Sequence, residues 1–469
     1  MTRSGYNTHM YRNAVRAVFV LLLLIVTVLA PVVTSGYFEL EQASNAASHW
    51  EMAEHYLNAA RRIPWRSDLY ELAGHAYYHA KEYALADIAY QTAFERDGLS
   101  AQGWVAWGDV HYLNADSERA SEIWEQALEQ ETVSDQLYSR LSQMYEESVE
   151  YPKAAAYLQN YVSAHQEDAS GHYRLGLLLT LSDPNKALSE LIGAAQLDPQ
   201  LDPAVQTLRT ALNLASLNES ASEKSVIIGR GLGLVGEWPL ARAAFQEAVH
   251  ADAKNAEAWA WLGEANQHME MDGTKELDQA LQLNPKSPAV RGLRGLHFQR
   301  AGNFREALAE FQSAAKLEPD NPAWQVSIGE AHAKLGDLIR ALEAYQTATA
   351  LAADDPGYWR LLAIFCAQNN IHIKDIGIPA AQKAVILAPE DTPSLEILGW
   401  LLLLDARNEE AERMLTRALE LDPGNASVHV HLGMLYLQKN DRASAYDHLI
   451  QARDLGNTEA EILLKQYFP

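Results

Sequence analysis

Small and apolar residues recur every 34 positions along most of this chain, from about Ser67 to Gly456. One set of positions, Gly295, Gly302, Ala307, Phe311 and Ala314, is repeated as Gly329, Gly336, Ala341, Tyr345 and Ala348. A fixed period of this length is typical of stacked supersecondary units that bury their apolar faces against one another. The pattern therefore predicts a solenoid rather than a single core around an active-site cleft.

Each unit is predicted to hold two helices joined by a tight turn. Small residues at positions 8, 20 and 27 of the unit allow close helix approach, and a large apolar residue at position 24 fills the remaining space. Position 24 holds Tyr90, Trp124, Phe245, Phe311, Tyr345 and Leu415. Gly or Asn near position 15 suits a left-handed turn, as at Gly236, Gly302, Gly336 and Asn408. Proline at position 32 ends the second helix because it lacks an N–H group, as at Pro199, Pro285, Pro319, Pro389 and Pro423.

Several copies carry a recognisable motif. Trp259, Leu262 and Gly263 spell W-x2-L-G. Fuller copies are Trp104, Trp107, Gly108, Ala120, Trp124 and Ala127, and Tyr70, Gly74, Tyr77, Ala86, Tyr90 and Ala93. On these residues the chain resembles the tetratricopeptide repeat family over most of its length. The resemblance implies an all-α fold, a right-handed α-solenoid whose concave groove binds proteins or peptides.

The copies occupy 67–100, 101–134, 135–167, 168–201, 222–255, 256–287, 288–321, 322–355, 356–391, 392–425 and 426–459. They form an N-terminal array over 38–201, which adds a half repeat to four copies, and a C-terminal array of seven over 222–459. Residues 460–469 are expected to cap the last apolar face. The pattern breaks at 202–221, where helical spacing predicts an extra helix and a seam. A smaller insertion lies between Ile371 and Pro379.

The N-terminus does not belong to the repeats. Residues 17–33 are uncharged and mostly apolar, and Arg3, Arg12 and Arg16 precede them. We expect 17–34 to be one transmembrane signal-anchor helix, with 1–16 cytoplasmic and the repeats extracytoplasmic at the cell membrane. The alternative is a signal peptide cleaved near Ser35, which would release a secreted protein. The helix before 50–60 is expected to continue directly from the anchor.

Charge and composition narrow the function. The net charge is −25, with 62 acidic and 37 basic residues, so no basic stripe is available for nucleic acid. The lone cysteine, Cys366, excludes an intrachain disulfide and a cysteine-based metal site. Gly231, Gly233 and Gly236 match GxGxxG, but they fall within the repeat pattern, not between a strand and a helix. We expect no enzyme, no cofactor and no catalytic residue.

His75 and His79 share one face of a predicted helix at the i, i+4 spacing of metal ligands. The neighbouring position 76 is not Glu, so the metalloprotease motif is absent, and we predict no metal. The same residues fall on the positions that line the groove in the resembled family. A solvated polar face without a role, peptide contact and a metal or enzyme site near His75 all stay open.

Mapped by the resemblance, the groove is expected to comprise Asp68, Glu71, His75, Tyr78, His79, Asp109, Tyr112, Arg230, Glu264, Arg300, Glu330, Lys334, Arg360 and Trp400. The groove positions of the second to fourth copies include acidic and aromatic residues and no base, whereas those of the later copies add bases. The Lys/Asn/Arg clamp that some relatives use for terminal carboxylates is absent.

These observations predict a membrane-anchored, bacterial-type scaffold that binds a protein or peptide partner. An accessory subunit of an envelope, polysaccharide or secretion machine is the alternative. The partner and the oligomeric state stay open.

Overall fold

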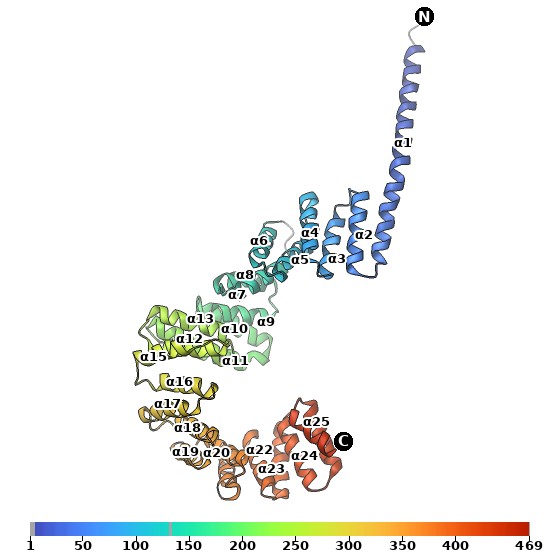
Figure 1. The fold of residues 1–469 in the computed structure, drawn as a ribbon. Coiled ribbons are helices and arrows are strands. Elements are labelled where there is room, and N and C mark those ends of the chain that lie inside the picture. The colour runs from blue at the N-terminus through green and yellow to red at the C-terminus, as the bar shows by residue number, and fades with distance from the viewer. Residues whose placement is uncertain (1–4, 131–133, 469) are drawn as a thin grey trace. The chain divides into compact units, whose positions relative to one another are not determined.

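The computed structural model describes residues 5–130 and 134–468; the side chains of 5–11, 13 and 21–26 lie outside this description. Helices make up the described secondary structure, and no strand occurs there. Residue contacts divide the chain into two compact units, 1–212 and 213–469. Both units consist of antiparallel helix pairs stacked in chain order (Figure 1).

The helices of unit 1 are α1 (Gly5–Ser44), α2 (His49–Arg62), α3 (Asp68–His79), α4 (Tyr83–Asp97), α5 (Ala101–Leu113), α6 (Ser117–Leu128), α7 (Asp135–Glu147), α8 (Tyr151–Ala164), α9 (Ala169–Leu179) and α10 (Pro184–Leu197), followed by the 3-10 turn η1 (Pro199–Leu201). The boundary between the units falls within α11 (Asp202–Ser216). This helix occupies most of the segment where the repeat pattern breaks.

Unit 2 continues with α12 (Ala221–Leu234), α13 (Trp238–Ala251), α14 (Ala256–His268), α15 (Thr274–Leu283), α16 (Pro288–Arg300), α17 (Phe304–Leu317), α18 (Pro322–Lys334), α19 (Leu338–Leu351), α20 (Pro356–Asn369), the π-helical turn η2 (Ile373–Gly377), α21 (Ile378–Leu387), α22 (Thr392–Leu404), α23 (Asn408–Leu421), α24 (Ala426–Gln438), α25 (Arg442–Asp454) and α26 (Thr458–Tyr467). The π turn absorbs the insertion between Ile371 and Pro379, and α26 packs on the final pair through Ala460 and Leu464.

Close helix approach inside each pair follows the predicted pattern. A Cβ atom on Gly74 would come 2.8 Å from the ring of Tyr90, and one on Gly229 would come 2.5 Å from the ring of Phe245. Both aromatic rings are fully buried. A glycine on the first helix therefore makes room for a large side chain on the second, because interiors pack too densely for both to be large.

The turns between paired helices confirm part of the prediction and correct another part. Gly236, Gly302 and Gly336 have φ values of 85°, 76° and 80°, which glycine adopts without a steric cost. Asn408, however, is the first residue of α23, and Ala406 takes the left-handed position with φ 59°. The stacking of the two helices thus imposes the turn even where the residue has a Cβ atom.

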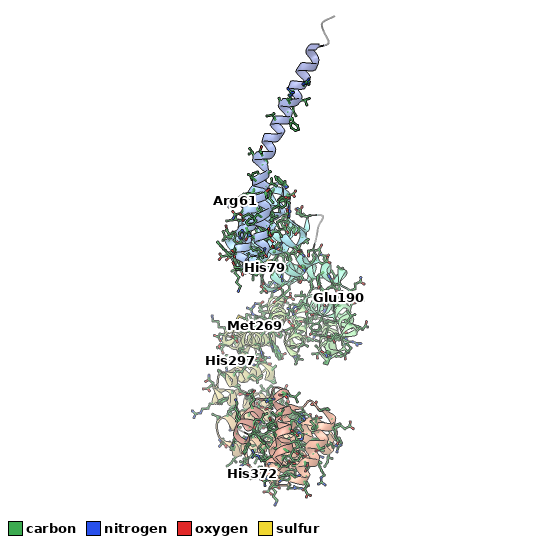
Figure 2. All side chains as sticks on the ribbon, turned by 90° about the vertical axis from the view of Figure 1, so that its right-hand side faces the viewer. Arg61, His79, Glu190, Met269, His297 and His372 are labelled. Carbon is green, nitrogen blue, oxygen red and sulfur yellow. The ribbon has the colours of Figure 1, made fainter. Side chains whose placement is uncertain are left out.

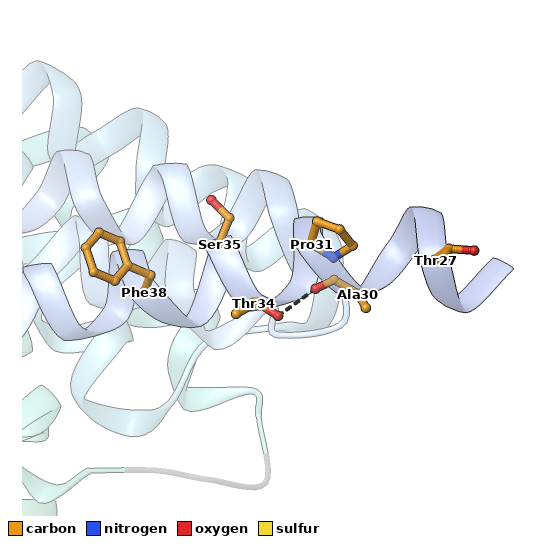
Figure 3. Close-up of a pocket in the computed structure, with 6 residues that line it drawn as sticks. All are labelled: Thr27, Ala30, Pro31, Thr34, Ser35 and Phe38. Carbon is orange, nitrogen blue, oxygen red and sulfur yellow. Dashed lines mark hydrogen bonds between the residues drawn. The ribbon is translucent and has the colours of Figure 1, made fainter. Parts of the chain in front are cut away.

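The first helix, α1, is one continuous helix of 40 residues that contains Pro31. Its last turns pack on α2, where a Cβ on Gly36 would lie 2.9 Å from Cγ2 of Ile63. A shallow hollow surrounds Pro31 (Figure 3), and the Thr34 hydroxyl there donates to the carbonyl of Ala30 at 2.7 Å. Among the residues that the structure describes, no helix is both long and apolar enough to cross a membrane. The side chains of 21–26, at the centre of the predicted span 17–34, are outside them.

Candidate functional site

The candidate site is the surface formed by the first helices of successive repeats, here called the A-helix face. In unit 1 these helices are α3, α5, α7 and α9. Glu71 on α3 accepts hydrogen bonds from the backbone N–H of Ser100, at 2.9 Å, and from its hydroxyl. Burial opposes ionisation of Glu71, but hydrogen bonds from His75 and Ser100 outweigh it and lower its pKa. Glu71 therefore ties one repeat to the next as a carboxylate.

The structure separates the two histidines that share a helix face. Nδ1 of His75 lies 2.8 Å from the Tyr90 hydroxyl, and its Nε2 lies 3.4 Å from Glu71. The ring of His79 instead packs against His49, with ring centroids 5.5 Å apart; Figure 2 labels His79 among the side chains of unit 1. No group of three candidate metal ligands occurs in the described part of the chain. His75 and His79 therefore make separate contacts, His75 with Tyr90 and Glu71 and His79 with His49.

Asp109 on α5 lies at the centre of an acidic and aromatic patch formed by residues of α3, α5 and α7. Its residue is only 8% exposed, and the Arg140 guanidinium contacts its two oxygens at 2.9 and 3.1 Å. Burial raises the pKa of Asp109, and Arg140 offsets this only in part. Burial and the charge of Asp109 also raise the pKa of Tyr78. The hydroxyl of Tyr112 donates to Glu147. These five residues, Tyr78, Asp109, Tyr112, Arg140 and Glu147, are called the unit 1 patch below.

The prediction of no base in this half concerned the groove positions alone, and two arginines reach the face from outside those positions. Arg140 binds Asp109, and Arg174 on α9 binds Glu146 through its Nε at 3.0 Å. Neither arginine occupies a position that lines the groove in the resembled family. Each reaches the face from a neighbouring position because an arginine side chain is long and flexible. A search for arginines about 30 residues after each acidic groove position would have found both.

In unit 2 the predicted bases of the face are partly used within the fold. Arg300 donates to Glu264, with one contact at 2.9 Å, and to Gln267 at 3.1 Å. Arg360 donates to Asp391 at 2.6 Å. Because these guanidinium groups already hold carboxylates of other helices, they contribute order between repeats rather than unpaired positive charge.

The remaining predicted residues of unit 2 are dispersed. Arg230 is exposed and lies over the ring of Trp261 at 5.2 Å. Glu330 accepts from Gln299 at 3.2 Å, and Lys334 is exposed. Trp400 stacks on His431, with ring centroids 5.1 Å apart. Asp68, at the start of α3 in unit 1, is engaged by Arg66 at 2.7 and 2.8 Å.

A polar hollow of about 550 Å³ opens beside Arg230 in unit 2. Its lining includes Arg230, Lys254, Glu223, Asp252 and Glu257. Two cations and three carboxylates leave it without a dominant charge.

Nucleophilic chemistry gains no support from the lone thiol, since burial raises the pKa of Cys366 to about 11 and the residue is fully buried. A thiol of this kind is unreactive.

Comparison with known proteins agrees with this architecture. Tetratricopeptide repeat models match residues 230–268, 293–356 and 402–466. Mouse (Mus musculus) Superkiller complex protein 3 is 27% identical over 263 residues, which cover 53% of this chain. The chain spans 15% of the length of that curated relative. The models support the tetratricopeptide repeat family for this chain, and the repeats of this family bind protein or peptide partners.

Three solved structures of low identity are similar to this chain at TM-scores below 0.5. Yeast Tom70 is 14% identical over 95% of each chain, with a TM-score of 0.41. A chain of the APC/C hetero-tetramer Cut9-Hcn1 is 15% identical over 96% of this chain and 98% of its own, with a TM-score of 0.40. YrrB, described as a TPR protein with an unusual peptide-binding site, is 19% identical over 40% of this chain and 97% of its own, with a TM-score of 0.33. Tetratricopeptide repeat models match parts of this chain of stacked helix pairs, and repeats of this kind typically form non-catalytic scaffolds for protein interactions.

Proposed function

We propose that this chain is a membrane-anchored scaffold whose unit 1 patch holds a basic segment of a partner protein. The observation that carries the proposal is the setting of Asp109. A nearly buried carboxylate lies beside two partly exposed tyrosines, Tyr78 and Tyr112, and near the exposed carboxylate of Glu147. Tyrosine supplies large contact area with a polar end, which is why it is enriched at protein interfaces.

Charge supports a basic partner. Residues 36–212 contain 27 acidic and 11 basic residues. A surface with this balance attracts lysine- and arginine-rich segments and repels acidic ones. Glu147 accepts hydrogen bonds from the Tyr112 hydroxyl and, at 3.0 Å, from the side-chain amide of Gln143. Neither partner is charged, so this exposed carboxylate keeps its negative charge and lone pairs for a cation of the ligand. The expected ligand is an extended or helical segment with a cation next to an apolar side chain.

The proposed anchor is the N-terminal run of residues 17–33, which follows three arginines and contains no charge. By the positive-inside rule, the repeats then lie on the extracytoplasmic side. Reporter fusions after residue 50 test the topology, and activity of a cytoplasmic reporter at this site would overturn it.

Binding of lysine- and arginine-containing peptides to the full-length protein tests the patch. The variant Tyr78→Ala/Tyr112→Ala should weaken binding about tenfold or more, since aromatic anchors commonly contribute 1–2 kcal/mol each. Ile88→Ala is the matched control, because Ile88 is 60% exposed on the second helix of a repeat. Binding should also fall as salt rises. Equal losses in both variants, or a preference for acidic peptides, would contradict the proposed site.

A further inference from the structure

The corner between α2 and α3, residues 61–66, lies next to the part of α1 that follows the apolar run. α2 packs antiparallel to the end of α1, which brings Ile63 against Gly36. Glu39 on α1 binds Arg62 and lies 2.6 Å from His55 on α2. These contacts fix the height of the corner along α1 at residues 36–39. Figure 2 labels Arg61 at the end of the helix stack from which α1 projects.

This height matches the headgroup layer of a bilayer if the apolar run spans its core. The run ends at Val33, and a helix rises about 1.5 Å per residue, so residues 36–38 lie about 5–8 Å beyond it. The polar layer on each side of a bilayer is about 5–8 Å thick, the difference between its total and its hydrocarbon thickness. The corner would therefore meet lipid headgroups rather than open water.

The side chains at this level have the chemistry of a membrane interface. Trp65 is 60% exposed, and Tyr37 and Phe38 on α1 are 49% and 58% exposed. Such exposure is costly in water, but tryptophan and tyrosine are enriched where headgroups meet hydrocarbon. In the headgroup layer, lipid would cover these exposed aromatic side chains, so their exposure does not require a protein partner.

The charge at the corner also differs from that of the rest of unit 1. Three arginines, Arg61, Arg62 and Arg66, occur within six residues of an otherwise acidic unit. Arg62 and Arg66 pair with carboxylates, whereas Arg61 is exposed and donates to the amide oxygen of Asn58 at 3.3 Å. Guanidinium groups bind phosphate through paired hydrogen bonds. The corner therefore offers donors to phospholipid headgroups.

We propose that the 61–66 corner is a lipid-binding surface, with Trp65 in the headgroup layer and Arg61 on a lipid phosphate, preferentially that of an anionic lipid. This inference rests on the proposed membrane anchor. It implies that the first helix pair is fixed upright on the membrane by two contacts, the anchor and the corner.

Fluorescence quenching in vesicles tests the proposal on the full-length chain. An environment-sensitive label is placed on Pro64→Cys at the corner and, as a control, on Ala47→Cys at the opposite end of α2. The 14 residues of α2 separate the two sites by about 21 Å. Cys366 is fully buried, so the label goes to the new cysteine. The vesicles are phosphatidylcholine with or without phosphatidylglycerol, and the quencher is a lipid brominated near its headgroup.

We expect quenching of the label at 64, stronger with phosphatidylglycerol, and none at 47. Trp65→Ser should reduce the quenching at 64, whereas Trp50→Ser, which removes an indole that is 49% exposed near the other end of α2, should not. Arg61→Gln should remove the difference between the two lipid mixtures. Equal quenching at 64 and 47, or no effect of Trp65→Ser, would overturn the proposal.

A label on Val20→Cys, inside the apolar run, separates the two hypotheses. If this label is quenched and the label at 64 is not, the anchor stands and the lipid-binding corner falls. If the label at 20 is not quenched either, the anchor itself is wrong and the corner falls with it.

Discussion

Replacing Gly176 with alanine tests whether close helix approach holds the repeats together. Gly176 lies in α9, where a Cβ atom would come 2.7 Å from Cγ of Leu191 and 3.1 Å from its backbone nitrogen. Carbon atoms in good contact are about 3.5–4.0 Å apart, so Leu191 or the whole of α10 must move by roughly 1 Å. Leu191 is fully buried, and overpacking of this kind costs about 1–3 kcal/mol.

Gly193 supplies a matched control in the facing helix. It lies in α10, two residues beyond Leu191, and a Cβ atom there would meet nothing within 4 Å. Alanine gains about 0.5–1 kcal/mol over glycine inside a helix at either position. This gain cancels in the difference between Gly176→Ala and Gly193→Ala. The difference in the free energy of unfolding is therefore the packing cost of about 1–3 kcal/mol.

Thermal unfolding followed by circular dichroism measures the difference. In a domain of about 200 residues, 1 kcal/mol shifts Tm by about 2–4 °C. We expect Gly193→Ala to melt slightly above the parent protein and Gly176→Ala to melt about 2–12 °C below Gly193→Ala. Hydrogen exchange should place the loss in α9 and α10, because repeats open locally. Equal melting temperatures for the two variants would refute the packing explanation.

Two further predictions concern charge and pH in unit 2. Arg300→Ala leaves Glu264, 4% exposed, without its main cation, so we expect the free energy of unfolding in denaturant to fall by about 2–3 kcal/mol. The control Arg340→Ala removes an exposed arginine and should lower this free energy by less than about 0.5 kcal/mol. Similar losses in the two variants would contradict the role of Arg300. Burial, followed by the neighbouring His429, lowers the pKa of His448. The unfolded chain thus takes up a proton at higher pH than the folded one, and protection of α25 from hydrogen exchange should fall as pH drops below about 6.5. His448→Gln should remove this pH dependence, and an unchanged profile would disprove the assignment.

Periodicity predicted the fold because each contact it encodes is local. A glycine and the large residue that fills the space beside it lie about half a repeat apart, as for Gly74 and Tyr90. Helix ends are also local, since a proline two residues past α10 or α15 stops the helix in either context. The left-handed turn was less well predicted. Ala406 occupies it despite its Cβ atom, because the two stacked helices determine where the chain must reverse.

The candidate site was only half predictable for a related reason. Position in the repeat placed Asp109 and Tyr112 on the A-helix face, but not the partners that decide their state. Arg140 lies 31 residues after Asp109, and whether the two meet depends on how adjacent repeats stack. The same stacking turns Arg300 from an expected ligand-binding base into the partner of a buried carboxylate.

The sequence by itself determined the helical repeat, its glycine and proline punctuation, the interruption before residue 222 and the acidic character of the chain. These follow from spacing and composition, which need no neighbours. Only the tertiary structure decided which charges are consumed between repeats, which carboxylate is nearly buried, and that the arginine- and tryptophan-containing corner at 61–66 lies beside the end of the apolar run. Burial and pairing depend on the approach of residues from different helices, and a repeat period does not specify how far each long side chain reaches.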